Sequence, residues 1–108
     1  MYLDRNNYND QVQKFCKENN IEHSWDFNSK NGTWNEILFD GKLLMQITQG
    51  ITVEQFKNVI TILSKNFYST EFPDNGIYFT VCIKQNKEYE NLFAKFLERY
   101  ADVFNIYV

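Results

Sequence analysis

Residues 21–48 read IEHSWDFNSKNGTWNEILFDGKLLMQIT and contain three runs in which apolar and polar residues alternate. This period of two is typical of strands with one face in the core. We expect strands at 21–28, Thr33–Phe39 and Lys42–Thr48. Residues 29–32 provide a loop, and Asp40-Gly41 is a strong signal for a two-residue type I′ turn. The stretch therefore predicts an antiparallel meander.

The turn residues also predict which face of the meander points inward. An uninterrupted hairpin at Asp40-Gly41 pairs Glu36 with Met45, and a four-residue first loop pairs Phe27 with Trp34. The inward face then carries Ile21, His23, Trp25, Phe27, Trp34, Leu38, Leu43, Met45 and Ile47. Glu36 shares this face with His23, and a buried polar group needs a hydrogen-bond partner. We expect these two side chains to satisfy each other or a backbone group.

The opposite face of the meander is the candidate functional surface. It places Ile37, Phe39 and Leu44 at the centre of a polar rim made by Glu22, Ser24, Asp26, Asn28, Thr33, Asn35, Gln46 and Thr48. An apolar centre with a polar rim is typical of protein-binding patches. We predict protein-binding residues at Glu22, Asp26, Ile37, Phe39 and Leu44. The alternative is that a helix covers this face and that its apolar residues belong to the core.

Helices are expected before and after the meander in the chain. Apolar residues at helical spacing predict a first helix over Tyr8–Asn19, ended by the Asn19-Asn20 pair in left-handed conformation. Thr52 and Gln55 have the spacing of a capping box, which predicts a second helix running to about residues 67–69. Asn86 is an N-cap for a third helix beginning at Lys87.

A fourth strand is expected between the last two helices. Residues 73–76 read Pro-Asp-Asn-Gly, which predicts a turn, and Ile77–Lys84 alternates as a strand does. Residues 103–108 have high β-propensity and form either a short terminal strand or the end of the last helix. The expected fold class is α+β, an antiparallel meander sheet of four or five strands packed by three helices, in the order α-β-β-β-α-β-α(-β).

Composition limits the class of protein. The 108 residues are 44% hydrophobic, which suits a single globular domain over residues 1–108 with a core that needs no disulfide or metal. No apolar run approaches the ~18 residues of a membrane span. Two cysteines without a secretion signal favour a cytoplasmic location. Fourteen Asn against two Ala indicate A/T-rich codons, which favours a low-GC bacterium or its phages and mobile elements.

Charge and residue types argue against several functions. The net charge is −3 and no basic run occurs, so nucleic-acid binding is not expected. His23, Cys16 and Cys82 are the only soft metal ligands besides methionine, and their spacing lacks the pairs of a zinc site. We therefore expect no metal, no cofactor and no catalytic residues, and Cys16 and Cys82 act as small buried side chains.

The sequence favours a small protein-binding module, for example an inhibitor, an immunity protein or an antagonist encoded by a phage or mobile element. It would act by steric blockade of a partner protein. One alternative is an accessory subunit or homodimer that uses the same surface for assembly. A second alternative is a small enzyme or ligand binder that uses His23 and Glu36 in a pocket walled by tryptophans.

Overall fold

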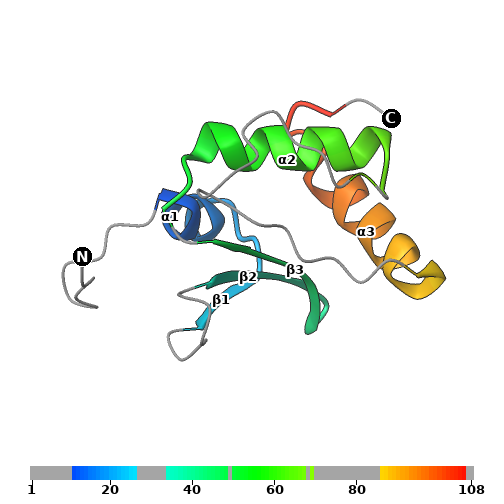
Figure 1. Ribbon diagram of the computed structural model, residues 1–108, viewed down its shortest axis with the longest axis horizontal. Coiled ribbons are helices and arrows are strands. Elements are labelled where there is room, and N and C mark those ends of the chain that lie inside the picture. Colours follow the sequence, from blue (N-terminus) through cyan, green and yellow to red (C-terminus); the bar gives the residue numbers. More distant parts are fainter. Residues whose placement is uncertain (1–10, 27–33, 49, 68, 70–85, 107–108) are drawn as a thin grey trace.

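The computed structural model describes residues 11–26, 34–48, 50–67, 69 and 86–106, and these residues form an α+β fold. Within them lie three helices and one antiparallel sheet of three strands (Figure 1). In chain order the elements are α1 (Gln11–Glu18), β1 (His23–Asp26), β2 (Trp34–Phe39), β3 (Lys42–Thr48), α2 (Val53–Lys65) and α3 (Lys87–Tyr100). No helix of the described residues is long and apolar enough to cross a membrane.

The sheet has the strand order β1-β2-β3, so the predicted meander is confirmed. Asp40 and Gly41 have φ angles of 55° and 75°, the two positive values that a type I′ turn requires. Gly41 tolerates this conformation because it has no Cβ. The predicted turn at residues 73–76 and the predicted strand at 77–84 lie outside the described residues, so the four-stranded sheet stays a prediction.

The register of the sheet differs from the predicted one. Phe39 pairs with Lys42 and Leu38 with Leu43, as expected, but an irregularity then makes Ile37 the partner of Met45. The extra residue, Leu44, is typical of a β-bulge, which shifts all later pairs by one position. In the other hairpin Asp26, not Phe27, pairs with Trp34. A shift of one residue exchanges the two faces of a strand.

The shift exchanges the inward and outward faces of β2 relative to the prediction. Asn35, Ile37 and Phe39 are buried, whereas Glu36 and Leu38 are only half-buried. The predicted register would have placed the Glu36 carboxylate in the core, and burying a charge costs far more than burying a neutral amide such as that of Asn35. The bulge also lets Leu44 and its neighbour Met45 both be buried. The inward orientation predicted for Met45 and Ile47 is confirmed, and that predicted for Leu38 and Leu43 is wrong.

The helix starts follow the predicted caps. The Thr52 hydroxyl accepts a hydrogen bond from the backbone N–H of Gln55 at 3.0 Å, and the Gln55 side chain accepts one from the N–H of Thr52 at 2.8 Å. Asn86 Oδ1 accepts from the N–H of Tyr89 at 3.0 Å. These bonds satisfy N–H groups that have no partner inside the helix. The predicted end of α2 at residues 67–69 is too late, because Asn66 is already extended, with φ −149°.

Two asparagines in left-handed conformation end helical segments. After α1, Asn20 has φ 57° and the N–H of Ile21 donates to the carbonyl of Cys16 at 2.8 Å. After α3, Asn105 has φ 55° and the N–H of Ile106 donates to the carbonyl of Ala101 at 2.9 Å. Both arrangements have the hydrogen bond of a Schellman motif, in which asparagine replaces the usual glycine.

The two Schellman motifs test the predicted ends of the first and third helices. The left-handed end predicted for the first helix is confirmed at Asn20. The alternative of a terminal strand is wrong for residues 103–106, because these residues continue α3 as turns up to Asn105.

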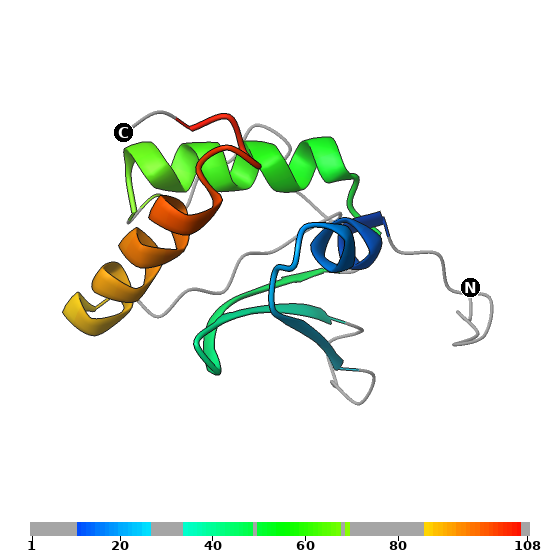
Figure 2. The same ribbon diagram turned by 180° about the vertical axis from the view of Figure 1, so that it is seen from behind.

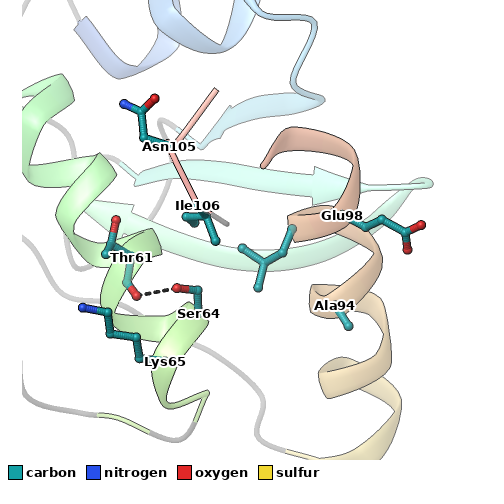
Figure 3. Close-up of a pocket in the computed structure, with 8 residues that line it drawn as sticks. Thr61, Ser64, Lys65, Ala94, Glu98, Asn105 and Ile106 are labelled. Carbon is teal, nitrogen blue, oxygen red and sulfur yellow. Dashed lines mark hydrogen bonds between the residues drawn. The ribbon is translucent and has the colours of Figure 1, made fainter. Parts of the chain in front are cut away.

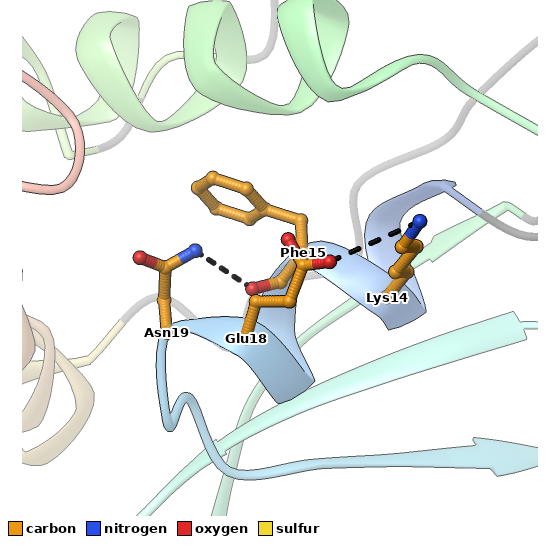
Figure 4. Close-up of polar contacts among 4 residues, drawn as sticks. All are labelled: Lys14, Phe15, Glu18 and Asn19. Atoms are coloured by element: carbon orange, nitrogen blue, oxygen red, sulfur yellow. Dashed lines mark hydrogen bonds and ion pairs between the residues drawn. The ribbon is translucent and has the colours of Figure 1, made fainter.

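A side-chain hydrogen bond and an ion pair lie on the surface of α1 (Figure 4). Asn19 Nδ2 donates to the carbonyl of Phe15 at 2.8 Å, and the backbone N–H of Asn19 donates to the same carbonyl at 3.1 Å. Lys14 Nζ and Glu18 Oε1 are 3.9 Å apart, and both side chains are largely exposed.

The core lies between the sheet and the helices. Figures 1 and 2 show α1 and α2 on one side of the sheet and α3 beside the end at which β2 turns into β3. A chain of aromatic rings joins these elements. Phe56 of α2 contacts Phe15 of α1 and Phe104 of the C-terminal turn, with ring centroids 6.0 and 5.5 Å apart. Phe96 of α3 contacts Phe104 at 5.9 Å and Phe39 of β2 at 6.2 Å.

Candidate functional site

The predicted protein-binding patch is not on the surface. Ile37, Phe39 and Leu44 are 0%, 7% and 2% exposed, so a partner has no access to them. The ring of Phe39 packs edge-on against Phe96, and the Arg99 guanidinium lies 4.8 Å from its centroid. The prediction of an exposed apolar face is therefore wrong, and the alternative, that helices cover this face, is confirmed.

Glu22, one of the two acidic residues of the predicted patch, is separated from its buried apolar centre. Glu22 is exposed, and its Oε2 accepts a hydrogen bond from the backbone N–H of Gly41 at 3.2 Å. Its backbone carbonyl accepts from the N–H of Leu38 at 2.9 Å. Asp26 is at the end of β1, paired with Trp34. The Glu22 carboxylate thus contacts the β2–β3 turn. Because Ile37, Phe39 and Leu44 are buried, the five predicted residues do not form one surface.

His23 and Glu36 lie on opposite faces of the sheet, so the prediction that they share a face is wrong. His23 is paired with Ile37, and its Nδ1 donates to the carbonyl of Ile21 at 2.8 Å. The expected backbone partner is therefore confirmed for the histidine. Glu36 accepts from the Ser24 hydroxyl at 2.7 Å and from Gln46 Nε2 at 2.8 Å. Its carboxylate links the three strands across the outer face.

Metal binding finds no support in the part of the chain that the structure describes. There, no group of three or more His, Cys, Asp or Glu side chains lies close enough to hold an ion. Cys16 is fully buried in α1, as expected for a small apolar side chain. Cys82 lies outside the described residues.

A groove lies between α2 and α3 (Figure 3). Its volume is about 710 Å³. We call it the α2–α3 groove and define it by Thr61, Ser64 and Lys65 of α2, Ala94, Leu97 and Glu98 of α3, and Asn105 and Ile106 of the C-terminal turn. The turn that ends at the left-handed Asn105 places Ile106 between the two helices (Figure 3).

The groove has an apolar floor and polar edges. Leu97 and Ile106 are half-buried and pack on the core, which leaves part of each side chain open to the groove. Lys65 and Glu98 are exposed, one on each helix (Figure 3). A surface of this kind can hold an apolar group while the edges make polar contacts.

The hydroxyls of Thr61 and Ser64, on the α2 wall of the groove, both donate hydrogen bonds to backbone carbonyls of α2. Thr61 Oγ1 donates to the carbonyl of Lys57 at 2.9 Å, and Ser64 Oγ donates to the carbonyl of Thr61 at 2.6 Å. A hydroxyl has a single hydrogen but two acceptor lone pairs. With both hydrogens used within α2, each oxygen keeps lone pairs that can accept a hydrogen bond from a bound molecule.

Smaller hollows elsewhere are more polar. One of about 390 Å³ is lined by Lys42, Glu88, Tyr89, Asn91, Leu92 and Lys95. Another, of about 490 Å³, adjoins the α2–α3 groove at Thr61 and Asn105 and is lined further by Val53, Glu54, Lys57, Asn58 and Phe104. Charged and amide side chains predominate in both, so neither offers an apolar anchor site comparable to Leu97 and Ile106.

The sequence did not indicate the groove. Residues 103–108 were expected to form either a short terminal strand or the end of the last helix. The available signal was Asn105, since asparagine is the residue that most often replaces glycine in the left-handed position after a helix. The small residues Ala94 and Ser64, at the walls of the groove, gave a second and weaker one.

Comparison of the chain with protein-family models, with curated proteins and with solved structures gave no match.

Proposed function

We propose that this protein is a protein-binding module and that the α2–α3 groove is its binding surface. The observation that carries the proposal is the partly open apolar floor of Leu97 and Ile106 between polar walls. Protein interfaces have this composition, an apolar centre inside a polar rim. The volume of about 710 Å³ lies in the range of sites that receive a side chain or a small ligand.

The mechanism that we propose is steric. A small folded domain that seats a partner's side chain in its groove covers the surrounding surface of that partner. Inhibitors, immunity proteins and antagonists encoded by phages or mobile elements act in this way, and the A/T-rich composition supports such an origin. An accessory subunit or a homodimer would use the same groove for assembly and would differ only in the identity of the partner.

A catalytic role has less support. The two residues that would carry it, His23 and Glu36, belong to opposite faces of the sheet. The Glu36 oxygens accept hydrogen bonds from Ser24 and Gln46, and the His23 ring is held by a backbone carbonyl. These contacts fit a structural role for both side chains.

The proposal is tested by blocking the groove without disturbing the core. Ala94 is exposed on α3, so Ala94→Arg places a long side chain in the groove at little cost to the helix. Asn91→Arg, also exposed and one turn earlier, adds the same charge outside the groove and is the matched control. The full chain and both variants serve as bait for cross-linking in lysates of low-GC bacteria.

We expect a partner whose affinity falls at least tenfold with Ala94→Arg and is unchanged with Asn91→Arg. Self-association that shows the same sensitivity in light scattering would assign the homodimer alternative. A partner that binds both variants equally well, or the absence of any partner, contradicts the proposal.

A further inference from the structure

We draw no further inference here: the strongest candidate, the partly open apolar floor of the α2–α3 groove at Leu97 and Ile106, belongs to the site already described, and nothing in the structure shows what covers it.

Discussion

The helix pair α2 and α3 and the β-meander differ in how far apart in the chain their decisive contacts lie. Thr52 and Asn86 each bond a backbone group three residues away, and the helices begin where these residues predict. In the meander, Glu36 is held by Ser24, twelve residues earlier, and by Gln46, ten residues later. Local bonds can be predicted from a short stretch of sequence, whereas strand register depends on distant partners.

The sequence of β2 also leaves open which of its two faces points into the core. β2 has apolar residues on both faces, with Ile37 and Phe39 on the buried face and Leu38 on the other. The alternation of β2 therefore identifies a strand without identifying its inner face. The four tests that follow separate the long-range contacts of the meander from the local contacts of the helices, from the largest expected effect to the smallest.

The largest effect is expected inside the meander, where adjacent residues of β2 should behave differently. Ile37 is fully buried, so Ile37→Ala should lower the free energy of unfolding by about 2–5 kcal/mol. Leu38 is half-buried on the other face, and Leu38→Ala should cost clearly less. Urea denaturation of both variants measures the difference. A larger loss for Leu38→Ala would support the uninterrupted register and contradict the bulge.

The end of α1 should be more sensitive to backbone conformation than to side-chain contacts. Asn20 has φ 57°, a conformation that costs an ordinary L-residue about 1–2 kcal/mol. Asn20→Ala should therefore destabilise the protein by about 1 kcal/mol. Asn20→Gly, which adopts this conformation freely, should be close to neutral. Equal effects of both substitutions in thermal denaturation would contradict a conformational cause.

The start of α2 tests a purely local contact. Thr52→Ala removes the hydroxyl that accepts the Gln55 N–H and should cost about 1 kcal/mol. Thr52→Ser keeps the oxygen and serves as the control, with little change in the denaturation midpoint. Hydrogen exchange should show the loss mainly in the first turn of α2, because the sheet does not depend on this bond. Uniformly faster exchange in the sheet would contradict that local role.

The smallest effect is expected for the ion pair on α1 (Figure 4). Lys14 and Glu18 are largely exposed, and an i,i+4 pair of this kind contributes only about 0.3–0.5 kcal/mol. Glu18→Gln should leave the urea midpoint almost unchanged, and 1 M salt should remove what difference there is. A loss above 1 kcal/mol would mean that Glu18 has a role beyond this pair.

Particular residues show how far sequence reasoning reached in the candidate site. Cys16 was predicted to be buried and is buried. The predicted protein-binding patch at Ile37, Phe39 and Leu44 was misplaced because its exposure followed from the assumed register. A shift of one residue in each of the two hairpins reversed the face of β2. The α2–α3 groove was missed because it depends on where Ile106 returns, which no periodicity encodes.

The sequence by itself determined the caps of α2 and α3, the left-handed end of α1 and the turn at Asp40-Gly41, because each depends on a few consecutive residues and their backbone preferences. Only the tertiary structure decided which face of β2 is buried, since keeping the Glu36 carboxylate out of the core requires an extra residue in β3 and a shift of the whole register. It also decided where the α2–α3 groove lies. Leu97 and Ile106 are nine positions apart in the chain, and they become one surface because the turn ending at Asn105 brings the chain back between α2 and α3.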